Sequence, residues 1–380
     1  MINTDTVIKY YFNFFNVKSY LRYLAVLKHH KKVKSSDVFP NSEDCFTLFN
    51  FNGPLWHYDS GRYTYLLVKS FHLAGFAIIL QTNYGLLSRL IKYKYLLRKI
   101  PFQLTDQLMF QKGLAEKNTV LIKKGPLVKE VHLCFKLGDV KLKENDFRMP
   151  YLMHPMIYSE GYDKKVFELR EQKSYCKILF AGNTDKREYS REALKKKFNK
   201  TNRFQAISYV IDHLAESELQ IIKNQERLDD TGEYRNKLLI VRSSDHKISF
   251  TNWLPAIAGA DFFFAASGSR MPMCHNAVEA MAVGSIPLLE YPEYFHPPLK
   301  NGYNCIVYSG CEDLKRKIQD ILEMPPNEIA ALKLNVINYY ESYLDPQKWI
   351  DDLLRLPHRE VNLIMDAYLT PSKKETPTDA

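Results

Sequence analysis

The chain has 380 residues and a formal net charge of +10, with 46% hydrophobic and 25% charged residues. This composition is normal for a globular protein, and the length is sufficient for two domains. The positive charge indicates an anionic partner, but no zinc-finger spacing or RNP-like motif accompanies the basic runs, and none of the six cysteines forms a C-x-x-C pair. The sequence therefore shows neither of these two nucleic-acid-binding motifs. The six cysteines are expected to be reduced thiols.

Residues 1–40 form a basic, aromatic segment that we expect to be helical. Two interpretations remain open: a helix packed on the first domain, or a helix lying on an anionic membrane surface. Lys9 and Asn13 interrupt its apolar stretch, no cleavage site follows, and no later segment is apolar enough to span a bilayer. We expect a cytoplasmic protein that binds peripherally, if at all, to the inner face of the membrane.

Residues 41–150 are predicted to form the first domain. An apolar run at 45–51 is followed by a turn-rich loop, by helical spacing over 63–74 that ends at Gly75, and by a buried strand at 76–81. This strand–helix–strand order predicts a parallel sheet covered by helices, which the apolar runs at 119–122 and 131–137 would extend.

Residues 151–369 are predicted to form the second domain, after a linker at 145–175 that contains two X-Pro breaks. Strands are expected at 176–181, 237–241, 260–265, 286–289 and 305–308, and helices at 276–283, 311–323 and 327–344. Residues 370–380 are expected to be a disordered tail. The fold class is therefore α/β with two Rossmann-like, doubly wound domains, in which ligands bind beyond the C-terminal ends of the strands.

The most informative stretch runs from 265 to 289 and reads AASGSRMPMCHNAVEAMAVGSIPLL. Small loop residues allow close approach of a ligand, and the free N–H groups where the helix begins favour phosphate. Glu279 lies within this apolar helix, so its carboxylate needs partners. Ribose hydroxyls are one choice, and a structural salt bridge to Arg270 or another cation is the alternative.

The run E-A-M-A-V-G-S-I-P-L-L resembles the nucleotide-binding segment of retaining GT-B glycosyltransferases. Together with the preceding S-G-S-R, it also resembles the C-terminal part of exostosin-like glycosyltransferases, over roughly residues 176–322. The resemblance implies a GT-B fold, with two Rossmann-like domains facing a cleft, and places Glu279 on the ribose of a nucleotide-sugar donor. The retaining family has a second Glu eight residues earlier, where this chain has Met271, so retaining and inverting chemistry both stay open.

The expected donor-binding residues come from two segments. The first segment supplies Ser269, Arg270, His275, Asn276 and Glu279, and the second, after the strand at 176–181, supplies Gly182, Lys186 and Arg187. The second segment is open to an alternative, a solvated helix start. No Asp-x-Asp triplet occurs in the chain, so we expect no metal and no cofactor, with the diphosphate neutralised by basic side chains and helix dipoles.

His154-Pro155 resembles the His-Pro pair of some GT-B sialyltransferases, although it falls in the predicted linker. In the first domain, the loop at 56–62 offers Asp59 and His57 as the catalytic base that an inverting enzyme needs. The alternative for Asp59 is a helix N-cap.

The absence of G-x-S-x-G and G-x-G-x-x-G motifs argues against a hydrolase of the nucleophile-elbow type and a dehydrogenase. We therefore expect a glycosyltransferase that moves a sugar from a nucleotide-sugar to a glycan or glycolipid acceptor, in cell-surface polysaccharide or lipopolysaccharide synthesis. No nucleic acid is expected as a partner. A non-catalytic nucleotide-sugar-binding protein of the same fold is the first alternative, and a basic nucleic-acid-binding protein is the second.

Overall fold

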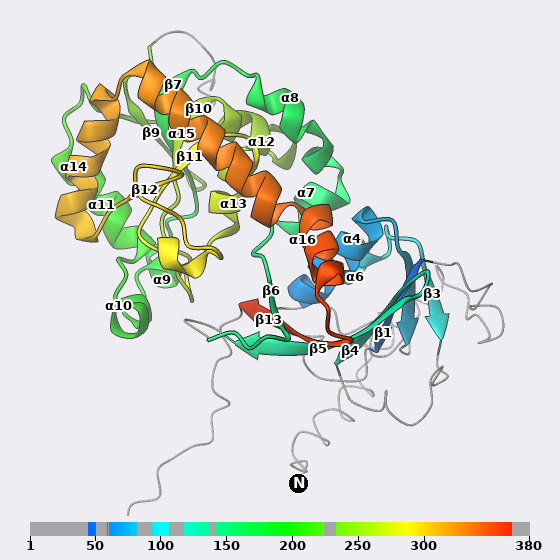
Figure 1. The fold of residues 1–380 in the computed structure, drawn as a ribbon. Helices are drawn as coiled ribbons and strands as arrows, with labels where there is room; N and C mark the ends of the chain where they lie inside the picture. The colour runs from blue at the N-terminus through cyan, green and yellow to red at the C-terminus, as the bar shows by residue number, and fades with distance from the viewer. Residues whose placement is uncertain are drawn as a thin grey trace, which may run out of the picture. The chain divides into compact units, whose positions relative to one another are not determined.

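The computed structural model describes residues 45–50, 59, 61–81, 93–105, 118–136, 141–223 and 233–366 (Figure 1). The predicted helical preface at 1–40 and the tail at 370–380 lie outside these residues. The chain forms two compact units, the first from the described residues up to 149 together with 349–366, and the second from those of 150–348. Both units contain helices and parallel strands, so the fold class is α/β.

The first unit contains a seven-stranded sheet in the order β3-β2-β1-β4-β5-β13-β6. Its strands are β1 (Phe46–Asn50), β2 (Ala77–Gln81), β3 (Phe102–Thr105), β4 (Thr119–Lys124), β5 (Leu127–Lys136), β6 (Asp146–Met149) and β13 (Glu360–Asp366). The sheet is mixed rather than parallel throughout, because β4 runs antiparallel to both β1 and β5. The turn between β4 and β5 has two residues, with Gly125 at φ 56°, and so short a connection can only join antiparallel strands.

Helix α4 (Arg62–Leu73) packs on this sheet through its buried face. The ring of Phe71 lies edge-on to Phe49 of β1, with centroids 5.8 Å apart, and to Trp349 of α16 (Pro346–Arg355), at 6.1 Å. Helices α4 and α16 therefore share the core of the first unit, and their ribbons lie next to each other in Figure 1. A short helix, α6 (Lys94–Leu97), packs against α4.

Strand β13 shows that the predicted extent of the second domain, 151–369, is wrong at its C-terminal end. β13 lies between β5 and β6 and is parallel to both. The buried pair Arg148 and Asp366 joins β6 to β13, with Nη1 3.0 Å from Oδ1. Residues 349–366 thus complete the first sheet, a long-range pairing that no local sequence pattern reveals.

The second unit contains a six-stranded sheet in which every pairing is parallel, in the order β12-β11-β10-β7-β9-β8. Its strands are β7 (Cys176–Gly182), β8 (Leu219–Ile221), β9 (Leu238–Arg242), β10 (Ala260–Phe264), β11 (Ile286–Leu289) and β12 (Ile306–Val307). From β7 the chain forms β8 and β9 on one side, and then crosses to form β10, β11 and β12 on the other. The direction of winding therefore reverses between β7 and β10, which is where open α/β sheets bind ligands.

Helices connect and cover these parallel strands. They are α7 (Pro155–Ser159), η2 (Tyr162–Lys165), α8 (Val166–Arg170), α9 (Lys186–Tyr189), α10 (Ala193–Phe198), α11 (Arg203–His213), α12 (Phe250–Ala258), α13 (His275–Ala282), η3 (Pro292–Tyr294), α14 (Gly310–Glu323), α15 (Pro326–Tyr339) and the π-helical turn η4 (Tyr340–Leu344). α13 packs on β10 and β11 and against α12 and α15, whereas α11 packs against α14.

The predicted linker at 145–175 is instead largely regular structure, since it contains β6, α7, η2 and α8. Pro155 is the first residue of α7, where its missing N–H and fixed φ are compatible with a helix. It therefore starts a helix rather than interrupting one.

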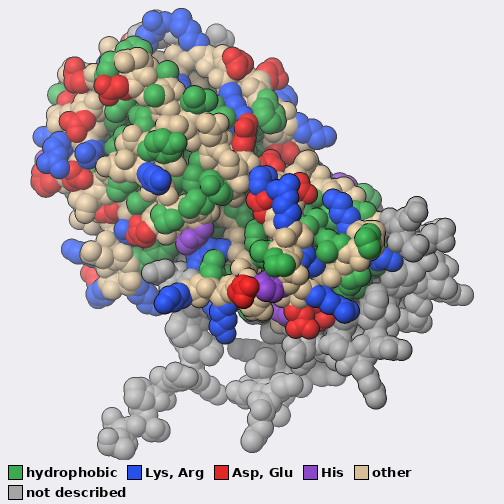
Figure 2. All heavy atoms as spheres, in the orientation of Figure 1, with side chains coloured by type: hydrophobic (Ala, Val, Ile, Leu, Met, Phe, Trp, Pro, Cys, Tyr) green, Lys and Arg blue, Asp and Glu red, His purple; other side chains and the backbone are tan. Residues whose placement is uncertain are grey.

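Within the described part of the chain, no helix is both long and apolar enough to cross a membrane. On the face drawn in Figure 2, basic and acidic side chains are interspersed over the surface.

Candidate functional site

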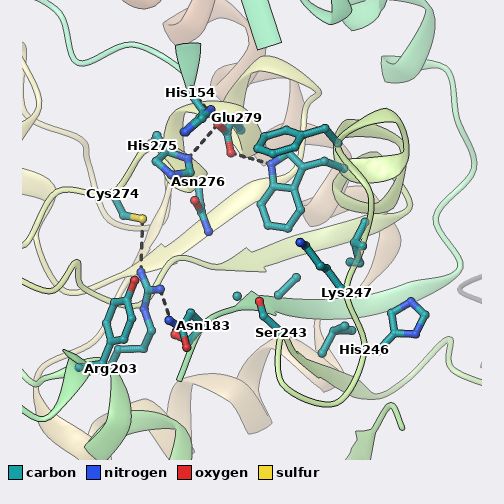
Figure 3. Close-up of a pocket in the computed structure, with 17 residues that line it drawn as sticks. His154, Asn183, Arg203, Ser243, His246, Lys247, Cys274, His275, Asn276 and Glu279 are labelled. Atoms are coloured by element: carbon teal, nitrogen blue, oxygen red, sulfur yellow. Dashed lines mark hydrogen bonds and ion pairs between the residues drawn. The ribbon is translucent and has the colours of Figure 1, made fainter. Parts of the chain in front are cut away.

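A cavity of about 250 Å³ lies in the second unit at the C-terminal ends of β7 and β9 (Figure 3). Most of its lining residues come from three segments. These are residues 181–183 at the end of β7, residues 241–250 at the end of β9 and in the segment after it, and residues 274–279 at the start of α13. All of its lining residues belong to the second unit. The cavity lies at the C-terminal edge of the parallel sheet, next to the place between β7 and β10 where the winding reverses, and this edge is the expected position of a ligand site.

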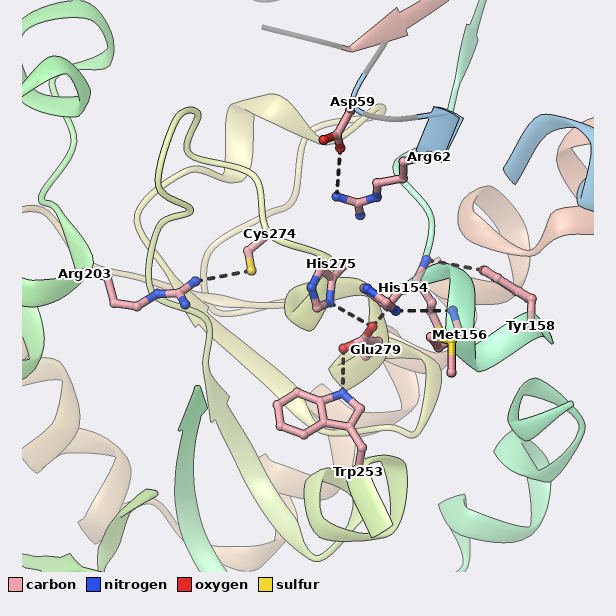
Figure 4. Close-up of polar contacts among 11 residues, drawn as sticks. Asp59, Arg62, His154, Met156, Tyr158, Arg203, Trp253, Cys274, His275 and Glu279 are labelled. Atoms are coloured by element: carbon pink, nitrogen blue, oxygen red, sulfur yellow. Dashed lines mark hydrogen bonds and ion pairs between the residues drawn. The ribbon is translucent and has the colours of Figure 1, made fainter. Parts of the chain in front are cut away.

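Glu279 is fully buried, and protein groups engage both of its oxygens (Figure 4). Oε1 accepts hydrogen bonds from the backbone N of His154, at 2.8 Å, and from Nδ1 of His275, at 2.9 Å. Oε2 accepts one from Nε1 of Trp253 at 2.7 Å. His275 and Glu279 are one helical turn apart on α13, so their side chains lie on the same face.

The electrostatic state of Glu279 follows from these contacts. Burial raises the pKa of this carboxyl, but the neighbouring His275 and the three hydrogen bonds outweigh burial and lower the pKa to about 2. An ionised carboxylate only accepts hydrogen bonds, so Nδ1 of His275 carries the donated proton and Nε2 is its other ring nitrogen. Of the two interpretations of Glu279, these contacts match the structural one, with His275 in place of Arg270.

Two rings bond this carboxylate and two more lie beside them, and we refer to His154, Phe250, Trp253 and His275 as the aromatic wall. All four line the cavity. The ring of His154 lies 5.4 Å from that of Phe250 and 5.0 Å from that of His275, between centroids. Glu279 bonds three members of the wall directly, so it fixes their positions relative to one another.

A second group of contacts centres on Arg203, which is 5% exposed. The guanidinium donates to the carbonyl oxygens of Ser267, Ala266 and Asn183 at 3.1, 3.2 and 3.3 Å, and to Sγ of Cys274 at 3.3 Å. It also lies 4.3 Å from the ring centre of Tyr189. Among the described residues, no acidic side chain pairs with it.

The surroundings of Arg203 are suited to an anion. α13 begins at Cys274 without a side-chain cap, which leaves the N-terminal end of the helix dipole uncapped. A Cβ on Gly182 would lie 3.5 Å from Nη1 of Arg203 and 4.0 Å from Nδ2 of Asn276, so this glycine separates the two donors. The exposed Lys247 also lines the cavity. Arg203 and Lys247 both line the cavity with Glu279, so the two cationic side chains outnumber the single carboxylate there.

The structure places four of the eight predicted donor-binding residues along the cavity: Gly182, His275, Asn276 and Glu279. Lys186 and Arg187 do not line it. Arg187 is 92% exposed and pairs with Asp185 at 2.9 Å, and Nζ of Lys186 lies 5.6 Å from the ring of Phe204. Their helix, α9, has a solvated start, as the alternative for this segment predicted.

Ser269 and Arg270 do not line the cavity either, and Arg270 is exposed. The loop folds back on itself at Gly268, whose N–H bonds the carbonyl of Pro272 at 3.0 Å. A Cβ on Gly268 would lie 2.7 Å from the carbonyl oxygen of Met271. The small residue at this position therefore allows the loop to turn back on itself, rather than allowing a ligand to approach.

In the first unit, Asp59 adopts a positive φ of 46°, and its side chain is 52% exposed and 4.0 Å from Arg62. The N-cap of α4 is Gly61, without a side-chain hydrogen bond, so the N-cap alternative for Asp59 is wrong. His57 lies outside the described residues.

Sequence reasoning did not select Arg203, Trp253 or Lys247, and assigned His154 to the linker. A signal for Arg203 was present, because it occupies the buried stripe of α11 with Ala206, Ile207 and Val210. A cation at an apolar stripe position of an amphipathic helix indicates a buried, functional or strongly bonded charge.

Among the residues that the structure describes, no group of three or more His, Cys, Asp or Glu side chains is placed to hold a metal ion.

No family model and no curated protein matches this sequence. Among solved structures, the chain is similar to the N-terminal domain of trehalose-6-phosphate phosphatase from Candida albicans, with 13% identity and a TM-score of 0.31. The alignment covers 52% of this chain and 45% of that one, so this chain spans less than half of its length. A likeness this distant carries no argument about function.

Proposed function

We propose that this chain is a glycosyltransferase of the GT-B type, with two Rossmann-like domains facing a cleft. The second unit would bind a nucleotide-sugar donor in the cavity at β7, β9 and α13, and the first would bind a glycan or glycolipid acceptor. The observation that carries the proposal is the buried guanidinium of Arg203, which has no acidic partner among the described residues and lines the ligand-binding edge of a parallel sheet.

A buried cation without a counter-charge is costly, so its persistence needs a reason. The N–H groups of Arg203 bond carbonyl oxygens and the sulfur of Cys274, and none of these acceptors is a carboxylate. A phosphate group would supply the missing negative charge. The start of α13 and the amine of Lys247 favour the same ligand.

The same groups suit the chemistry of glycosyl transfer. The acceptor oxygen attacks the anomeric carbon, the bond from that carbon to the donor phosphate breaks, and negative charge builds on the departing nucleoside diphosphate. Arg203, Lys247 and the α13 terminus would stabilise this charge without reorganisation. The proton of the acceptor hydroxyl passes to a base, for which Asp59 remains our prediction if the reaction inverts.

Binding of UDP, GDP and CMP, measured by calorimetry on the full chain, tests the phosphate site. We expect Lys247→Met to weaken the best of these nucleotides about ten-fold, because hydrogen bonds to charged groups contribute ~1.5–3 kcal/mol. Arg203→Lys keeps a charge but loses the fork of donors, and should weaken binding by at least as much. Lys195→Met, an exposed lysine that does not line the cavity, is the matched control. Equal affinities in all four proteins would refute the site.

Turnover distinguishes an enzyme from a non-catalytic binding protein of the same fold. With the nucleotide-sugar that binds best, we expect donor consumption that Asp59→Asn reduces ~100-fold while donor affinity is kept. Tight donor binding with no consumption, in the parent and the variant alike, would instead support the binding protein.

A further inference from the structure

At the Glu279 end of the cavity, the carboxylate and the N–H groups around it are engaged with one another. The carboxylate takes the N–H groups of His154, Trp253 and His275, and Nδ1 of His154 accepts from the backbone N of Met156 at 3.2 Å. Both oxygens of Glu279, which could otherwise accept from sugar hydroxyls, are therefore already used. What the aromatic wall still presents to a ligand is mainly ring surface.

Phe250 is the outermost member of the wall by exposure. It is the first residue of α12 and is 45% exposed, although it lines the cavity. The adjacent His154 ring is tilted against it by 36°, so two aromatic rings lie next to each other at this edge of the cavity. A large aromatic side chain left open at the edge of a cavity is a ready stacking surface for a planar ligand.

The two ends of the cavity thus differ in chemistry. Figure 3 shows Arg203 and Asn183 at one end, and His154, His275 and Glu279 at the other. One end offers positive charge and N–H donors, whereas the other offers π faces and a carboxylate whose two oxygens already accept hydrogen bonds from the protein.

We propose that the aromatic wall binds the planar base of a nucleotide whose phosphate lies at Arg203. This inference rests on the proposed function, because it divides the same cavity into a phosphate end and a base end. Stacking on an aromatic side chain suits every nucleobase, because each has a π face. Glu279 is then a positioning residue that holds His275 and Trp253 for the base, and it does not bind the ribose.

Calorimetry on the full chain tests the wall with six probes: UMP, CMP, GMP, AMP, ribose 5-phosphate and glucose 1-phosphate. We expect at least one nucleotide to bind about ten-fold tighter than ribose 5-phosphate, which carries the same phosphate and sugar without the base. Phe250→Ala should remove this advantage and leave the affinity for ribose 5-phosphate unchanged.

Phe167→Ala is the matched control, because Phe167 is 67% exposed and does not line the cavity. It should change neither affinity. Since Phe250 is itself largely exposed, its replacement is expected to fold, which a melting curve verifies.

Three results would overturn the base site: ribose 5-phosphate binding as tightly as all four nucleotides, glucose 1-phosphate binding more tightly than any of them, or Phe250→Ala weakening every probe equally. In each case the phosphate site at Arg203 and the proposed glycosyl transfer would stand. Conversely, nucleotides could bind more tightly than ribose 5-phosphate in a way that depends on Phe250, while no nucleotide-sugar is consumed. That result would support base binding at the aromatic wall and refute the proposed glycosyl transfer.

Discussion

At the scale of single residues, the state of Glu279 determines how the site is organised. A carboxylate with no exposed surface remains ionised because three N–H groups from separate places in the sequence converge on it. Those groups come from the backbone before α7, from α12 and from α13 itself. The residue therefore holds together elements that the chain forms more than a hundred positions apart.

Replacing Glu279 by Gln removes the charge and turns one acceptor into a donor that faces an N–H. Because the folded-state pKa is lowered from 4.5 to about 2, the charged form contributes stability that is fully present above pH ~4.5. We expect Glu279→Gln to cost about 3 kcal/mol in urea unfolding at pH 7.

The pH dependence provides the second half of this test. The parent protein should lose that contribution as the pH falls from about 4.5 towards 2, whereas the Gln variant should lack this part of the slope. Glu323→Gln, at an exposed position of α14, is the control and should leave stability at pH 7 within ~0.5 kcal/mol. A Glu279→Gln protein as stable as this control would contradict a carboxylate held by three donors.

Site residues could be predicted from the sequence where they lie close together along the chain on one element. His275, Asn276 and Glu279 lie on one short helix, so finding the helix located all three. Arg187 was selected because it follows β7 closely, but a four-residue helix turns it towards Asp185 and solvent. Arg203 lies further along the chain and reaches the cavity only because the start of α11 lies beside Asn183, which follows β7, and this is tertiary information.

At the scale of elements, the segment from α16 to β13 depends on one buried lysine of a neighbouring strand. Lys129, on β5, is 1% exposed and donates to the carbonyl oxygens of Leu356 and of His358, the latter at 2.7 Å. Burial lowers the pKa of this lysine. The ammonium thus satisfies carbonyl groups just beyond the end of α16, a position where positive charge also meets the helix dipole.

Lys129→Met keeps most of the apolar stem but leaves two carbonyl groups without their donor. We expect a loss of about 1–3 kcal/mol in the stability of the first unit, because unsatisfied buried acceptors carry the desolvation cost. Hydrogen exchange measured by mass spectrometry should show faster exchange in β13 and the end of α16. Unchanged exchange in β7 and β10 of the second unit is the internal control, and equal exchange in β13 of both proteins would contradict this role.

Elements with continuous apolar runs were the most predictable. β7, β10 and β11 are largely buried in a parallel sheet, so their sequences read as hydrophobic segments interrupted only by Lys177 in β7 and Asp261 in β10. β13 was missed because it is a short run, EVNLIMD, whose partners lie more than two hundred residues earlier. β4 and β5 were located, but their antiparallel pairing depends on a turn whose geometry was not considered.

At the scale of the whole molecule, the two units differ in how their sheets are assembled from the chain. The second sheet comes from one continuous stretch, whereas the first needs residues 349–366 in addition to the described residues before 150. A chain that ends at residue 348 would leave β5 and β6 without the strand between them, and would remove Trp349 from its contacts with Phe71 and Phe147.

We expect such a shortened chain to lose the first unit and to aggregate through its exposed strand edges. Nucleotide affinity, which depends on the second unit, should remain within about three-fold of the parent. Limited proteolysis should digest residues before 150 and leave a resistant fragment that contains β7 to β12. A fragment pattern identical to that of the full chain would contradict this dependence.

The balance of charge in the cavity gives a prediction about metal ions. If Arg203, Lys247 and the start of α13 neutralise the phosphates, nucleotide affinity should be the same within about two-fold with EDTA and with manganese. Calorimetry in both buffers measures this. An affinity that rises ten-fold or more with manganese would show that a cation bridges the phosphates and that the protein groups act beside it.

The position of β13 also has a consequence for the order of folding during synthesis. As the ribosome works along the chain, β1 to β6 emerge first, then the entire second unit, and only afterwards the strand that joins β5 to β6. The second unit can therefore reach its final fold while the first still exposes two unpaired edges. β5 and β6 therefore stay without their common partner until β13 has been synthesised. During this interval their exposed edges can aggregate, so we expect a chaperone to assist folding most at this stage.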